Sequence, residues 1–60
     1  MLTEPHGPYT LHVYDWSTDD RAVFEVVIED EGEAVFWQSG FASEAEAVEV
    51  ARRKILEAEF

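Results

Sequence analysis

Cysteine is absent from this sequence of 60 residues. Without cysteine the chain has neither a disulfide framework nor a thiolate metal site. A chain of this length buries only about 60% of the surface that its unfolded form exposes, so its core is thin. We therefore expect residues 1–60 to form a single domain, which is too small for a doubly wound nucleotide-binding sheet or a barrel enzyme.

Basic side chains are also scarce. Four Lys and Arg residues stand against fourteen Asp and Glu residues, which gives a formal net charge of −10, and Arg21 is the one base before Arg52. Because phosphate binding requires cations, this charge argues against direct binding to nucleic acid or to an anionic membrane. The acidity instead fits solubility, adaptation to a salty cytoplasm, or attraction of a basic partner.

Long apolar runs are missing as well. No stretch approaches the roughly 18 apolar residues of a membrane span. The first residues, Met1 to His6, have neither the basic segment nor the apolar run of a secretory signal. We therefore expect a cytoplasmic protein without membrane contacts.

Alternating apolar and polar side chains, typical of strands, occupy three segments of the chain. Residues 9–16, 22–29 and 34–39 have this period of two and are rich in β-branched and aromatic residues. The preceding residues, 1–8, hold two prolines and a glycine and are expected to form an extended lead-in. The side chains expected to face the core are Leu11, Val13, Phe24, Val26, Ile28 and Phe36.

The turn between the second and third strands allows two registers. A three-residue loop at 30–32, with Gly32 in the left-handed conformation, would pair Val26 with Phe36. A two-residue loop would move every partner by one and place Trp37 on the core face. The sequence leaves both registers open.

A helix is expected over residues 44–58. Ser43 is a favourable N-cap, and Glu46 three positions later completes a capping box. The sequence therefore predicts an α+β fold with two layers, a three-stranded antiparallel β-meander followed by one C-terminal α-helix packed on one face. The apolar stripe of the helix consists of Ala47, Val48, Ala51, Ile55 and Ala58.

The stretch Ser39-Gly40-Phe41-Ala42-Ser43-Glu44-Ala45-Glu46-Ala47 joins a strand that ends in glycine to a capped helix that begins with Glu-Ala. Together with the element order, it resembles the partial RNase H-like domain of HicB-type antitoxins and the small YegP-like domains of unassigned function. The resemblance implies a βββα fold and a protein that binds other proteins rather than catalysing a reaction. Residues 33–38 differ from the Asp-x-Pro-Gly-like segment that HicB-type antitoxins carry there.

No pattern in the sequence points to catalysis or to a metal. His6 and His12, with Glu4 or Asp15, have a spacing that matches no metal-binding motif. The acidic pairs fall in expected turns, and a two-layer unit of this size leaves little room for the cleft that paired catalytic carboxylates need. We expect no enzymatic activity, no metal and no cofactor. The serines that lack a nucleophile-elbow motif are Ser17, Ser39 and Ser43.

The sheet face opposite the helix is expected to be unusually apolar and aromatic. A surface of this kind is typical of a protein interface, although cross-strand aromatics can also simply stabilise a thin sheet. The expected interface residues are His12, Tyr14, Trp16, Val23, Val27, Val35 and Trp37. The expected acidic surface consists of Asp19, Asp20, Glu25, Glu29, Asp30, Glu31 and Glu33.

The sequence thus favours a small acidic, non-catalytic protein-interaction module that forms a homodimer through this face. The alternative is an acidic decoy that fills the basic groove of a nucleic-acid-binding protein, as a phage inhibitor or an antitoxin does.

Overall fold

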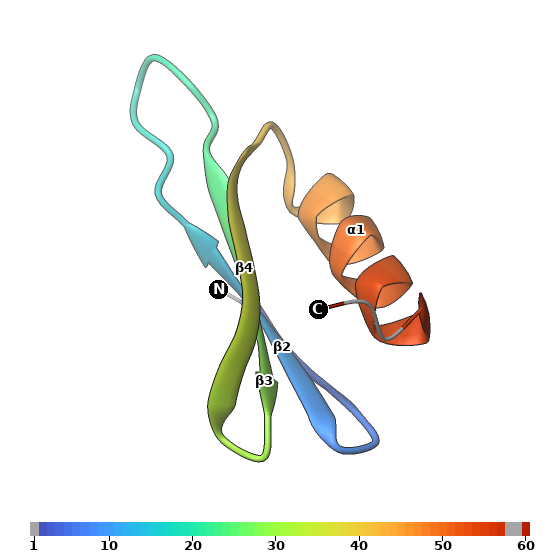
Figure 1. The fold of residues 1–60 in the computed structure, drawn as a ribbon. Helices are drawn as coiled ribbons and strands as arrows, with labels where there is room; N and C mark the ends of the chain where they lie inside the picture. Colours follow the sequence, from blue (N-terminus) through green and yellow to red (C-terminus); the bar gives the residue numbers. More distant parts are fainter. Residues whose placement is uncertain (1, 58–59) are drawn as a thin grey trace.

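The computed structural model describes residues 2–57 and 60, which form one antiparallel sheet and one helix. The strands are hydrogen-bonded in chain order, and the helix packs on one face of the sheet, mainly against the second and third strands (Figure 1). The predicted α+β class and the helix that follows the sheet are confirmed, but the sheet has four strands rather than three. The elements are β1 (Leu2–His6), β2 (Tyr9–Asp15), β3 (Phe24–Asp30), β4 (Glu33–Phe41) and α1 (Glu44–Glu57).

The additional strand, β1, lies where an extended lead-in was expected, and that expectation is wrong. β1 pairs with β2, from Leu2 opposite Val13 to His6 opposite Tyr9. Pro5 is compatible with this position because β1 is an edge strand, and an edge strand has a side on which no backbone donor is needed. The glycine and proline that suggested a loose segment form instead the two-residue hairpin loop at 7–8, in which the glycine has a φ of 61°.

The core lies between α1 and the sheet. Leu11, Val13, Val26 and Ile28 point toward the helix with at most 1% of their surface exposed, as their alternation predicts. The small side chains of α1 allow the helix to lie close to these strands. The other buried residues are Phe41, Ala47, Val48 and Ala51, and Phe24 and Phe36 are half-buried against them.

The hairpin between β3 and β4 combines features of both expected registers. Its loop has two residues, Glu31 and Gly32, both with positive φ. A bulge follows at Val35. Ala34 pairs with Glu29 and Phe36 pairs with Ile28, so Val35 has no partner on β3. Because one extra residue reverses the alternation, Phe36 remains on the core face and Trp37 on the opposite face. Neither alternative therefore holds in full: Val26 does not pair with Phe36, and Trp37 does not lie on the core face. The expected face of Phe36 is confirmed.

A second bulge lies at the end of β4. Ser39 pairs with Glu25 and Phe41 pairs with Phe24, so Gly40 is the additional residue. Its φ of 91° falls in a region that residues with a Cβ rarely adopt. This bulge places Phe41 in the core, where only 5% of its surface is exposed.

The start of α1 agrees with the predicted cap. The Ser43 hydroxyl accepts a hydrogen bond of 3.1 Å from the backbone N–H of Glu46. The helix is described as far as Glu57, so the predicted last residue, Ala58, lies outside the described residues. Beyond it, the ring centroid of Phe60 lies 5.2 Å from that of Tyr9.

Candidate protein-interaction surface

The sheet face that points away from α1 is called the outer face here. In the register of the sheet, one row of this face runs from Thr3 through His12 and Val27 to Trp37. The next row holds Tyr14, Glu25 and Ser39, and Trp16 continues the line of β2 beyond it. Among the described residues, α1 packs on the opposite side of the sheet, mainly against β2 and β3.

Both tryptophans lie on the outer face and both are exposed. Trp16 has 62% of its surface exposed and Trp37 has 67%. Neither ring faces α1, because Trp37 lies opposite Val27 on β3 and Trp16 contacts Tyr14 and Glu25 on the outer face. The two rings lie at separate places on this face, one at the end of β2 and one on β4, and exposed tryptophans are among the side chains most often buried in an interface.

A line of neighbouring rings runs along β2 and just beyond its end. The ring of Tyr14 lies 6.3 Å from that of His12 and 6.4 Å from that of Trp16, measured between centroids. The indole Nε1 of Trp16 donates a hydrogen bond of 3.2 Å to the Glu25 carboxylate. These contacts hold the aromatic side chains in defined positions before any partner binds, which reduces the entropy that binding would remove.

The two carboxylates in the middle of this face each have a ring nitrogen as a partner. Glu25 is held by Trp16, and Glu29 is held by Nε2 of His12. Nδ1 of the same imidazole lies 3.2 Å from the Thr3 hydroxyl. The carboxylates of Glu25 and Glu29 therefore both have hydrogen-bond partners on the outer face.

Most of the expected interface residues come together on the outer face, but the three valines occupy different positions. Val27 is half-buried in the middle of the sheet, and Val23 lies just before β3, where its carbonyl accepts a hydrogen bond from the Trp16 backbone N–H. Val35 lies at the bulge and packs against the core cluster, so we do not include it in the surface. Thr3 belongs to the outer face and was missed because β1 was not predicted.

The expected acidic residues occupy three separate places. Asp19 and Asp20 lie in the loop between β2 and β3, which projects beyond the sheet (Figure 1). Glu25 and Glu29 lie on the outer face. The others lie at the opposite end of β3, in the hairpin to β4, and are Asp30, Glu31 and Glu33.

Three of the four basic side chains contact groups on the helix side of the sheet. Arg52 contacts Glu4, and Arg53 lies 3.3 Å from Glu49 on the same helix. The ammonium group of Lys54 lies 5.4 Å from the ring centre of Phe36. The two faces therefore differ in chemistry, with three cations on the helix side and the two exposed tryptophans on the outer face.

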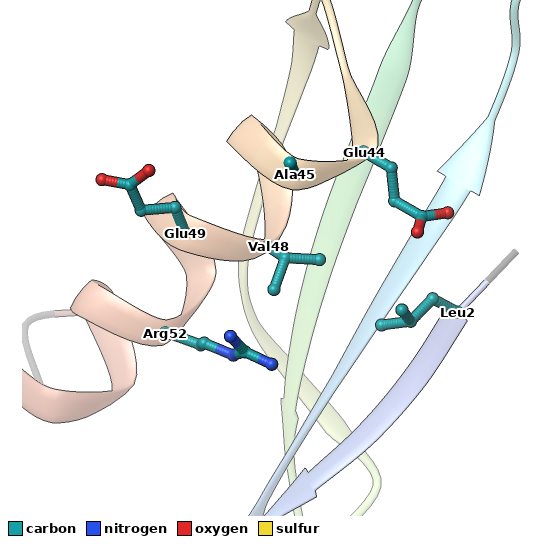
Figure 2. A pocket seen from close by; sticks show the side chains of 6 residues that line it. All are labelled: Leu2, Glu44, Ala45, Val48, Glu49 and Arg52. Carbon is teal, nitrogen blue, oxygen red and sulfur yellow. The ribbon is translucent and has the colours of Figure 1, made fainter.

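An open hollow of about 470 Å³ separates β1 from the first half of α1 (Figure 2). Its apolar lining comes from Leu2, Ala45 and Val48, and Arg52 points toward it from the helix. That arginine is already held by Glu4, through hydrogen bonds of 2.9 Å from Nε and 2.7 Å from Nη2. The two bonds connect the first strand to the helix.

This contact makes the fold sensitive to acid. The hydrogen bonds from Arg52 hold the pKa of the Glu4 carboxyl below its usual range, with a smaller contribution from His6, although partial desolvation acts in the opposite direction. Because the pKa is lower in the folded state, the contact stabilises the fold above the usual pKa of glutamate and ceases to do so as the pH falls through the lowered value.

We therefore expect Glu4→Gln to lower the melting temperature at neutral pH and to have a smaller effect at a pH of about 3. Thermal unfolding followed by circular dichroism at both pH values measures this difference. Glu33→Gln is the matched control, because it removes the same charge at an exposed position. If Glu4→Gln has no larger effect than the control at neutral pH, the contact with Arg52 does not stabilise the fold.

The described residues do not assemble a metal site or a membrane span. Within residues 2–57 and 60, no group of three or more His, Cys, Asp or Glu side chains is arranged to hold a metal ion. No helix in the described part of the chain is long and apolar enough to cross a membrane. His6 contacts the Glu4 carboxylate, and Ser43 caps the helix, so both have structural partners.

Comparisons with protein-family models, with curated proteins and with solved structures find no match to this chain. The interpretation of the outer face therefore rests on its own residues and their contacts.

Proposed function

We propose that this protein is a non-catalytic interaction module that forms a homodimer through the outer face. The observation that carries the proposal is the exposure of Trp16 and Trp37 on the one sheet face that the helix does not cover. Tryptophan is among the residues that contribute most to interface energies, and the resemblance to antitoxin domains also favours binding over catalysis.

The dimensions of the domain are compatible with a second copy as the occupant. The chain extends over 36 × 19 × 15 Å. A standard interface takes roughly 800 Å² from each partner, so it would occupy most of one side of a chain of this size. A small domain also gains from association, because pairing two sheets face to face adds a second apolar layer to a thin core. A two-fold axis would place the same surface on both sides and close the assembly at two copies.

Sedimentation equilibrium at physiological ionic strength tests this proposal. The fitted mass should rise with protein concentration from 6.9 kDa toward twice that value. The tryptophan emission should move to shorter wavelength over the same concentrations, because both indoles leave water on association. A mass of one chain at every concentration would refute the homodimer.

The acidic decoy is the second candidate, and the separation of charges supports it. Carboxylates occur at both ends of β3 and on the outer face between them, whereas Arg52 and Arg53 have partners on the helix side. A complex with a basic nucleic-acid-binding protein would weaken as salt is added, since salt screens opposite charges. Dimerisation of this anionic chain would instead be preserved or strengthened by salt, so a salt series distinguishes the two candidates.

A further inference from the structure

Of the described residues on the outer face, His12 is the one that can become a cation, and it lies beside the carboxylates that a second copy would cover. The imidazole is half-buried between β1 and β3, with Thr3 at one ring nitrogen and Glu29 at the other. A hydroxyl can donate or accept, so Thr3 can satisfy Nδ1 whether or not that nitrogen carries a proton. The side chain can therefore change its charge without losing its hydrogen bonds.

The charged groups that share the outer face with this imidazole are the carboxylates of Glu25 and Glu29. Glu29 contacts it directly, Glu25 lies on the same face of β3, and Tyr14 stacks against its ring. Val27, directly opposite on β3, is uncharged. The contact between Arg52 and Glu4 lies on the other side of the sheet, on which α1 also packs.

Dimerisation would bring the carboxylates of both copies into one interface. If His12 is neutral, Glu25 and Glu29 of each copy add four negative charges at a surface from which water is removed. If it is protonated, each Glu29 has a cation beside it and the net charge of the interface is halved. Since unlike charges gain strength as water leaves, the protonated form is the one that the covered face favours.

We infer that association through the outer face takes up protons at His12, so that the homodimer becomes tighter as the pH falls through the range in which imidazoles titrate. This inference rests on the proposed homodimer and adds a regulatory property to the same surface. The sign follows from linkage: the form with more bound protons is the dimer, so a lower pH drives association.

The test compares dissociation constants by sedimentation equilibrium at a pH of about 5.5 and of about 8, at constant ionic strength. We expect the wild-type constant to be about tenfold lower at the acidic pH. His12→Gln keeps a polar side chain without a titratable charge, and its constant should be equal at both pH values. Circular dichroism confirms that the variant is folded.

His6→Gln is the matched control. His6 contacts Glu4 on the helix side of the sheet, so its removal changes the overall titration of the chain by the same one group without altering the outer face. This variant should keep the full pH dependence of the wild type. If the control loses as much pH dependence as His12→Gln, the effect comes from net charge and the inference is overturned.

The remaining outcomes separate the inference from the proposal on which it depends. A dimer whose constant is independent of pH, or one that stays equally pH-dependent in His12→Gln, refutes proton uptake at His12 and leaves the homodimer intact. A chain that is monomeric at both pH values refutes both.

Discussion

Trp37→Glu is expected to leave the chain monomeric at concentrations at which the wild type is dimeric. Trp37 is exposed at the β4 end of the row that contains Val27 and His12. The substitution removes a large apolar surface and adds a carboxylate to a face that already holds Glu25 and Glu29. Loss of an exposed tryptophan and the added repulsion should raise the dissociation constant about a hundredfold or more. Sedimentation equilibrium measures this change.

Leu56→Glu provides the control for this variant. Leu56 has 86% of its surface exposed on α1, so its replacement also exchanges an exposed apolar side chain for a carboxylate but does so away from the outer face. The variant should dimerise nearly as well as the wild type. Equal effects of Trp37→Glu and Leu56→Glu would show that added charge, and not the outer face, governs association.

Leu11→Ala is expected to remove most of the stability of the fold. Leu11 has 0% of its surface exposed, at the centre of β2 between the helix and the neighbouring strands. Truncation of a buried leucine costs about 2–5 kcal/mol, and a chain of this length has a total stability of about 3–9 kcal/mol. Urea unfolding followed by circular dichroism should show a much lower midpoint or a chain that is unfolded without denaturant.

Leu56→Ala is the same chemical change at an exposed site of α1. It should alter the free energy of unfolding by no more than about 0.5 kcal/mol. Both variants are compared at one protein concentration, because self-association would add to the apparent stability. A small effect of Leu11→Ala, similar to that of Leu56→Ala, would contradict the placement of Leu11 in the core.

The parts of the fold that depend on local patterns could be predicted from the sequence. Alternation in β2 and β3 identified Leu11, Val13, Val26 and Ile28 as core residues, because one face of each strand is uniformly apolar. The start of α1 could be predicted because Ser43 supplies a specific hydrogen bond to the helix N-terminus. These signals are contained within a few neighbouring residues.

The parts that depend on partners distant in the sequence could not be predicted. β1 contains Pro5, which argues against a strand. The alternation of its side chains between the two faces becomes clear only when its pairing with β2 is known. The bulges at Val35 and Gly40 could not be predicted either. Each is a residue of β4 that has no partner on β3, so it can be recognised only when the pairing of the two strands is known. The first bulge decides the face of Trp37, which is why the sequence alone left that face open.

For the candidate surface, too, local patterns could be predicted and contacts between strands could not. His12, Tyr14 and Trp16 could be assigned to one face because they alternate along a single strand. The hydrogen bonds that connect them to Glu25 and Glu29 join different strands, so they required the register of the sheet. Val35 was assigned to the surface only because the bulge was unknown.

The buried face of the sheet is covered by one element, α1, and this has a consequence for folding. Whenever α1 is not docked, one side of the sheet has no cover over its leucine, valine and isoleucine side chains. Chains in this condition are prone to associate wrongly. The many carboxylates of the chain repel one another between neighbouring molecules, and this repulsion opposes such association.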